Sequence, residues 1–118
     1  MPKYDLEDRT AKFGLEVIKF VRGLPKNYLT SPILSQLIRS ATSIGANYSE
    51  ADDAESNKDS IHKLGICKKE ARETKHWLRM IAETEPPSKP KARTLWQEAK
   101  ELNLIFNSII IKLKNKVI

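Results

Sequence analysis

Apolar residues recur along the chain at alternating steps of three and four positions, with polar residues between them. This spacing is the roughly 3.5-residue period of helices that pack along one apolar stripe, which we call a seam. One such seam consists of Leu34, Leu37, Ala41, Ile44, Tyr48 and Ala51. Together, the seams predict helices over about residues 5–22, 31–54, 57–83 and 89–116.

Glycine and proline mark the connections between these helices. Gly23 and Pro25 end the first helix, and Ser31 is a candidate N-cap for the second, with Pro32 at its first helical position. The prolines of residues 85–90 separate the third helix from the fourth, because proline cannot occupy a helix interior. Connections this short require antiparallel neighbours. The chain is therefore predicted to be all-α: an antiparallel up-and-down four-helix bundle, with residues 1–118 forming one domain.

Apolar residues also lie outside the seams, for example Leu15 and Ile18 in the first helix and Trp96 in the fourth. A single four-helix core needs one apolar stripe per helix, and a small monomer does not comfortably leave many further apolar positions in water. We therefore expect the chain to self-associate. A monomer with a wider core is the alternative.

Cysteine usage and hydropathy indicate the compartment. The single cysteine, Cys67, excludes an internal disulfide and is typical of a reducing environment. The first residues lack the apolar core of a signal peptide, and no apolar run approaches the ~20 residues that cross a bilayer. We expect a cytoplasmic protein that does not enter a membrane.

The net charge of +6 comes mostly from residues 86–118, which carry seven basic and two acidic side chains. Two basic clusters stand out: Lys68, Arg72, Lys75 and Arg79 on one face of the third helix, and Lys112, Lys114 and Lys116 near the C-terminus. Such clusters attract nucleic acid through phosphate contacts and counterion release, although each could also be a solvated face. No aromatic stacking platform is visible beside them, so binding should depend on backbone and shape.

Polar residues follow the seam of the second helix. Arg39, Ser43 and Asn47 lie four residues apart, and Glu70 and Glu73 share one side of the third helix. Because the two helices are antiparallel neighbours, we predict a polar network in which Arg39 meets a carboxylate. Ser43 and Asn47 would complete its hydrogen bonds. A ligand or catalytic site is the less favoured alternative, because no nucleophile or metal-binding set accompanies these residues.

Other catalytic patterns are weak. Glu73 and His76 form one Glu-x-x-His pair, whereas a di-iron bundle needs two such pairs and further glutamates. Cys67 lies in a seam without a partner base, which indicates a buried, inert thiol. We therefore expect no enzyme activity, no catalytic residue, no metal and no cofactor. A metal-dependent bundle enzyme is a remote alternative.

Three segments carry a resemblance to a known family: FGLEVIKFVRGLP at residues 13–25, QLIRSATSIGANYSEA at residues 36–51, and KEARETKHWL at residues 69–78. They resemble the bacterial four-helix-bundle proteins called 23S rRNA intervening-sequence proteins. This resemblance implies a homopentamer of up-and-down bundles around a central channel. The chain is also similar to the accessory variability determinant of diversity-generating retroelements, a basic pentamer that binds nucleic acid and a reverse transcriptase. The resemblance implies no catalytic residues.

These observations predict a non-enzymatic, oligomeric helical protein that binds nucleic acid, with structured RNA or rRNA-derived sequence as the ligand. The basic clusters favour this function. The alternative is a protein-interaction scaffold or accessory subunit, for example for a reverse transcriptase. The acidic residues between Glu50 and Glu55 favour that alternative, because they repel phosphate.

Overall fold

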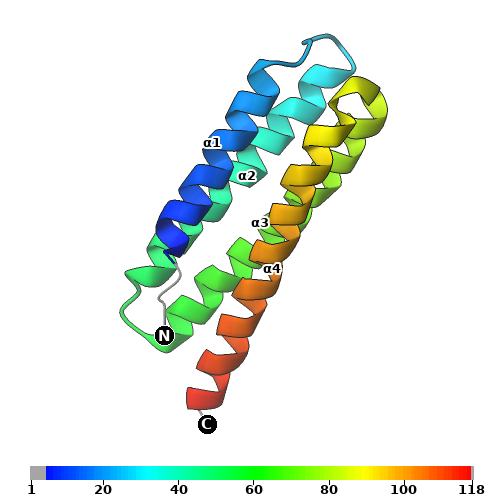
Figure 1. Cartoon of the computed structure of the whole chain (residues 1–118). Helices are drawn as coiled ribbons and strands as arrows, with labels where there is room; N and C mark the ends of the chain where they lie inside the picture. The colour runs from blue at the N-terminus through cyan, green and yellow to red at the C-terminus, as the bar shows by residue number, and fades with distance from the viewer. Residues whose placement is uncertain (1–4, 118) are drawn as a thin grey trace.

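The structure, a computed structural model, describes residues 5–117, except for the side chain of Val117. Its elements are α1 (Leu6–Arg22), α2 (Thr30–Asp52), α3 (Asn57–Thr84), the 3₁₀ turn η1 (Pro86–Ser88) and α4 (Lys89–Val117). The helices alternate in direction along one common axis, and α1 lies beside α2 while α3 lies beside α4 (Figure 1). The predicted all-α, up-and-down four-helix bundle is confirmed.

Side chains at the starts of α1 and α3 accept hydrogen bonds from backbone N–H groups that have no partner within the helix. The Asp5 carboxylate accepts from the backbone N–H of Asp8 at 3.1 Å, and the Ser56 hydroxyl accepts from the backbone N–H of Asp59 at the same distance. Both contacts are N-caps, which stabilise a helix by about 1 kcal/mol each. Ser56 thereby caps α3, which begins at Asn57, the start that the sequence predicts.

The start of α2 differs from the prediction, because Ser31 does not cap it. The Asn27 side-chain oxygen accepts from the backbone N–H groups of Leu29 and Thr30, at 2.9 and 3.0 Å. In return, the Thr30 hydroxyl accepts from the backbone N–H of Asn27 at 3.0 Å and donates to the carbonyl of Pro25 at 2.6 Å. This reciprocal arrangement resembles a capping box and starts the helix at Thr30.

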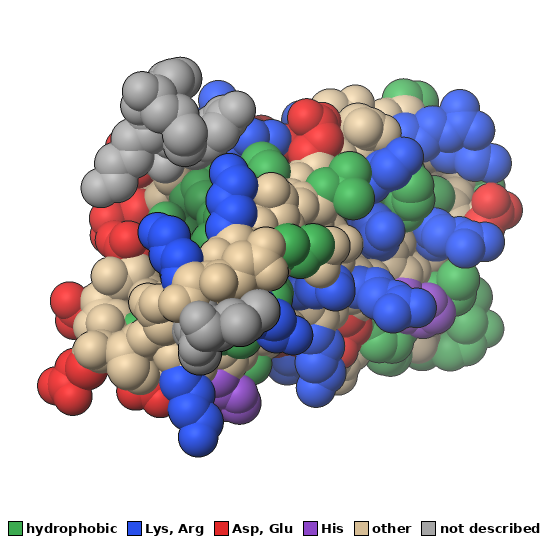
Figure 2. Space-filling view, turned by 90° about the horizontal axis from the view of Figure 1, so that it is seen from below, with side chains coloured by type: hydrophobic (Ala, Val, Ile, Leu, Met, Phe, Trp, Pro, Cys, Tyr) green, Lys and Arg blue, Asp and Glu red, His purple; other side chains and the backbone are tan. Residues whose placement is uncertain are grey.

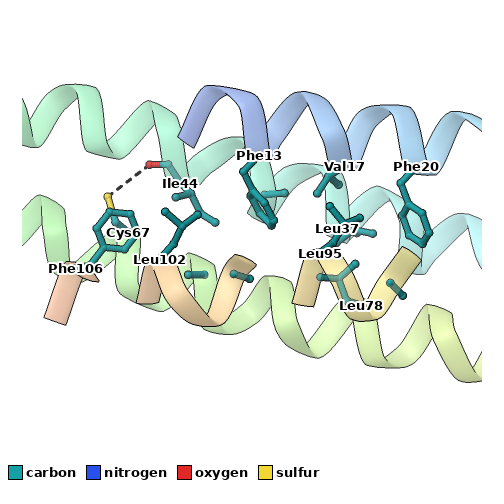
Figure 3. Close-up of a cluster of buried hydrophobic side chains, with 14 of the residues drawn as sticks. Phe13, Val17, Phe20, Leu37, Ile44, Cys67, Leu78, Leu95, Leu102 and Phe106 are labelled. Atoms are coloured by element: carbon teal, nitrogen blue, oxygen red, sulfur yellow. Dashed lines mark hydrogen bonds between the residues drawn. The ribbon is translucent and has the colours of Figure 1, made fainter. Parts of the chain in front are cut away.

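The seams meet along the bundle axis and form one continuous core. Phe13, Val17, Leu37, Ile44, Leu78, Leu102 and Phe106 are among the buried side chains, and Figure 3 shows them pointing inward from all four helices. Burial of this apolar surface is the main favourable term in folding. Near the end of α4, Ile110 is buried, whereas Ile109 is only partly buried.

The four helices differ in length, and this makes the bundle asymmetric. At about 1.5 Å per residue, the 17 residues of α1 and the 29 residues of α4 span roughly 26 and 44 Å. The end of α4 therefore extends past the start of α1, as Figure 1 shows. A bidentate ion pair connects α1 to α4: Nε and Nη2 of Arg9 each lie 2.8 Å from a carboxylate oxygen of Glu98.

Candidate nucleic-acid interface

The predicted polar network lies between α2 and α3. The Arg39 guanidinium donates to Glu70 at 3.1 Å and to Glu73, while the indole N–H of Trp77 donates to Glu73 at 3.2 Å. Glu70 is buried, so its charge requires a cation in contact with it. The structure therefore brings Arg39, Glu70 and Glu73 together.

Ser43 and Asn47 do not complete this network. The Ser43 hydroxyl donates to the carbonyl of Arg39 at 2.6 Å, and the Asn47 amide donates to the carbonyl of Ser43 at 2.9 Å. Both side chains therefore bond to their own helix, which is a common outcome for short polar side chains in helices.

Two residues that were not included in the predicted network link the helices instead. The Thr74 hydroxyl donates to the Ser40 hydroxyl at 2.9 Å, and both residues are fully buried. The sequence could have indicated this contact, because Thr74 lies within the seam of α3 and Ser40 lies beside the seam of α2. Within the described residues, every buried side-chain nitrogen and oxygen has a hydrogen-bond partner. The buried part of the contact between α2 and α3 is therefore a satisfied structural network in the described residues.

The basic cluster of α3 extends along the boundary with α4. The Lys68 ammonium donates to the Asn107 side chain of α4 at 2.9 Å, and the Lys75 ammonium lies 5.2 Å from the centre of the Trp96 ring. Arg79 lines a groove between the two helices, and Arg72 is exposed. The positive charge of α3 is thereby added to that of α4 on one face of the bundle.

The groove has a volume of about 550 Å³ and lies between the C-terminal part of α3 and the N-terminal part of α4. Its apolar lining includes Leu78, Ala82, Ala92 and Trp96, and its charged lining consists of Arg79, Glu83, Lys89 and Arg93. Lys89 pairs with Glu83 at 3.4 Å. The groove therefore combines an apolar surface with an excess of positive charge.

Of the three C-terminal lysines, one lies near the basic cluster of α3. Lys114 lines a second hollow, of about 440 Å³, together with Lys68 and Lys69 of α3. Lys112 and Lys116 are exposed near the end of α4. The structure therefore places Lys114 near the basic cluster of α3.

Acidic side chains concentrate where α2 meets α3. Glu50, Asp53, Glu55 and Asp59 line one hollow there, and Lys63 pairs with Glu50 at 3.1 Å. Seen from the end of the bundle where α1 begins and α4 ends, most acidic side chains lie at one edge, and basic side chains are spread over the rest of the surface among apolar and other groups (Figure 2). The α2–α3 turn therefore carries mainly negative charge, whereas the face of α3 and α4 carries mainly positive charge.

Cys67 and His76 are the other candidates for chemistry that the sequence raised, and both lie in the described part of the chain. Burial raises the pKa of the Cys67 thiol to about 12, and the thiol donates to the carbonyl of Ile44 at 3.5 Å (Figure 3). His76 is exposed and packs edge-on against Trp77. Residues 5–117 contain no group of three His, Cys, Asp or Glu side chains that could hold a metal ion. None of their helices is long and apolar enough to cross a membrane.

Comparison with known proteins agrees with the fold. The model of the family described as 23S rRNA-intervening sequence protein matches residues 3–108. The chain is similar to a solved structure of a protein with unknown function from the S23 ribosomal protein family of Bacteroides thetaiotaomicron. The sequence identity is 34% and the TM-score is 0.78, over 88% of this chain and 96% of that chain. No curated protein matches the sequence. The bundle and the family match over most of its length establish that this chain belongs to the 23S rRNA-intervening sequence protein family.

Proposed function

We propose that this protein binds nucleic acid, preferentially structured RNA, through the basic face of α3 and α4, and that it catalyses no reaction. One observation carries the proposal: cations from two helices converge on shared features of one face. Lys75 and Lys100 both lie within 6 Å of the Trp96 ring centre, at 5.2 and 5.7 Å. Arg79 and Arg93 line one groove. Convergent cations of this kind are what a phosphate backbone requires.

The family supports RNA over DNA as the ligand, since it takes its name from intervening sequences in 23S rRNA. The proposed compartment is the cytoplasm, where the single cysteine remains reduced. Self-association, with a pentamer as the expected form, belongs to the same proposal. Each additional subunit would contribute another basic face, so that weak phosphate contacts add to strong, salt-sensitive binding.

The test is salt-dependent binding of a labelled structured RNA. Replacement of Lys68, Arg72, Lys75 and Arg79 by glutamine should weaken binding at least tenfold at about 0.1 M salt, because counterion release scales with the number of neutralised phosphates. The slope of log affinity against log salt should also become shallower, by about 0.9 for each phosphate that the variant no longer neutralises.

A matched control removes the same charge elsewhere. Lys12, Lys19, Arg22 and Lys58 are exposed and lie outside the α3–α4 groove, so their replacement by glutamine should change affinity by less than about threefold. Equal reductions in both variants would show a response to net charge alone. No binding of the unmodified protein at low salt would contradict the proposal.

A protein-interaction scaffold is the second candidate, and the acidic α2–α3 turn favours it. Glu50, Asp53, Glu55 and Asp59 form a surface that phosphate would avoid but that a basic protein would accept. A nucleic-acid-binding enzyme, such as a reverse transcriptase, has a surface of that charge. Replacement of these four residues by their amides should weaken binding of such a partner while RNA binding is kept.

A further inference from the structure

We propose that Trp96 is a stacking platform for an unpaired base, and that the groove between α3 and α4 binds a single-stranded segment of nucleic acid. This inference rests on the proposed function and specifies which part of a nucleic acid the basic face contacts. It changes the expectation drawn from the sequence, in which no aromatic platform accompanied the basic clusters. The platform is formed only when α4 packs on α3.

Trp96 is partly buried, and cations approach its ring from two helices. The Lys75 ammonium of α3 lies 5.2 Å from the ring centre, and the Lys100 ammonium of α4 lies 5.7 Å from it. Base–aromatic stacking is stronger than a cation–π contact at an exposed site, so a base can take the place of one lysine at the ring. The displaced ammonium would then lie close to the phosphate of the same nucleotide, where its charge remains paired.

Two guanidinium groups complete the site. Arg79 and Arg93 line the groove together with Trp96, and neither has an ion pair or a side-chain hydrogen bond with another residue of the described chain. A guanidinium presents a planar fork that binds phosphate oxygens in pairs. Glu83, the carboxylate that lines the groove, pairs with Lys89 and forms no ion pair with either arginine in the described chain.

The dimensions and lining of the groove favour an unpaired base over a duplex. Its volume of about 550 Å³ lies within the range of small-ligand sites, roughly 300–1,000 Å³. Leu78, Ala82 and Ala92 add apolar surface beside the indole ring. The π-face of a base in a double helix is covered by its neighbours, whereas bases in loops, bulges and ends are free to stack on aromatic side chains.

The experiment uses Trp77→Phe as the background, because Trp77 and Trp96 are the two tryptophans of the chain. In this variant the tryptophan emission comes from Trp96. Addition of a single-stranded oligouridine or oligothymidine should quench that emission, and a blunt duplex of equal length should not. If both oligonucleotides quench equally, the site recognises the base and phosphate chemistry that RNA and DNA share. If only oligouridine quenches, the ligand is RNA.

Affinity measured by the anisotropy of a labelled single strand gives the second readout. Trp96→Leu should weaken binding about tenfold or more, whereas Trp96→Phe should restore most of it because an aromatic face is retained. A purely structural role for Trp96 would reduce thermal stability without this separation between leucine and phenylalanine.

Each negative result has a distinct meaning. If the single strand binds the protein but Trp96 emission does not change, the stacking platform is wrong and the proposed function stands. The same holds if Trp96→Leu binds as well as the unmodified protein. If neither structured RNA nor single strands bind at low salt, both proposals fail. If Trp96→Leu does not fold, the quenching measurement in the Trp77→Phe background still tests whether a base stacks on Trp96.

Discussion

At the scale of single residues, Arg39 is the side chain that connects α2 to the carboxylates of α3. It contacts Glu70, which is buried, and Glu73, which also accepts from Trp77. An exposed ion pair contributes little to stability, but removal of one partner leaves a buried charge without compensation. The energetic importance of Arg39 therefore comes from the burial of Glu70 and not from the number of its contacts.

Replacement of Arg39 by alanine should lower the free energy of unfolding by about 1–2 kcal/mol, since the Glu70 carboxylate then lacks its cation. Urea denaturation monitored by circular dichroism measures this decrease. Arg39→Lys should show a smaller decrease, because the charge is kept but the planar fork is not. Arg72 is exposed on the same helix as Glu70, and Arg72→Ala should stay within about 0.5 kcal/mol of the unmodified protein. Equal effects of Arg39→Ala and Arg72→Ala would contradict the argument.

The Cys67 thiol gives the protein a specific response to alkaline pH. Burial raises its pKa in the folded protein from the ordinary 9.0 to about 12, so between these values the unfolded chain loses the proton first. A raised pKa of this kind contributes stability that is complete below about pH 9 and is lost as the pH rises towards 12.

Thermal or urea unfolding at pH 8 and pH 10.5 tests this behaviour. The unmodified protein should lose about 1–2 kcal/mol more than Cys67→Ala over that interval, because the other titrating groups are common to both proteins. In a parallel measurement, an aromatic disulfide reagent at pH 8 should react with the thiol only after denaturant is added. Rapid reaction of the folded protein would show that the thiol is accessible.

At the scale of elements, two helical glycines have opposite surroundings. A Cβ at Gly45 of α2 would lie 3.3 Å from the Thr10 hydroxyl of α1, and that hydroxyl is held by the carbonyls of Leu6 and Glu7. A Cβ at Gly65 of α3 would meet nothing within 4 Å. The absence of a side chain at Gly45 therefore permits close packing of α1 on α2, whereas Gly65 serves no such purpose in the described chain.

Gly65→Ala should raise the free energy of unfolding by about 0.5–1 kcal/mol, which is the gain in helix propensity at an open position. Gly45→Ala should give no gain or a net decrease, because the fixed Thr10 hydroxyl would have to move. Both stability predictions are checked by comparing the denaturation midpoints of the two variants under one set of conditions. A stabilising Gly45→Ala would show that α1 can shift away from α2 at little cost.

At the scale of the whole molecule, the basic face and an apolar hollow lie on different pairs of helices. The basic face belongs to α3 and α4, whereas α1 and α2 share a shallow apolar hollow of about 430 Å³. Its lining includes Ala11, Leu15, Ile18 and Ala46. Leu15 is 59% exposed. A second copy of the chain could cover this surface while the basic face remains open to nucleic acid, so the two proposed roles do not compete for one surface.

Light scattering should give a mass well above the 13.5 kDa of one chain, and near 68 kDa if five copies assemble as the family resemblance implies. Leu15→Glu should shift the mass towards that of the monomer, because a charge in an apolar interface has no partner. Lys12 is exposed on the same helix and does not line the hollow, so Lys12→Glu should leave the mass unchanged. A monomeric unmodified protein would overturn self-association.

The sequence alone determined the helices, their order and their buried sides, because each depends on neighbours three and four residues away and on the turn residues between. It also indicated that Arg39 meets a carboxylate of α3, since one register aligns the two stripes. It did not identify the Ser40–Thr74 contact, the Asn27 cap or the Trp96 groove.

Only the tertiary structure decided which side chains of different helices share a site. The rotation and offset of α4 on α3 follow from the packing of all four seams at once, and no local pattern encodes them. That packing brings Arg79 of α3 beside Arg93 and Trp96 of α4, and Lys68 beside Lys114. It thereby places cations of both helices near Trp96 and brings one lysine of the C-terminal cluster near the cluster of α3. The relative positions of charges on separate helices are set by the core between them.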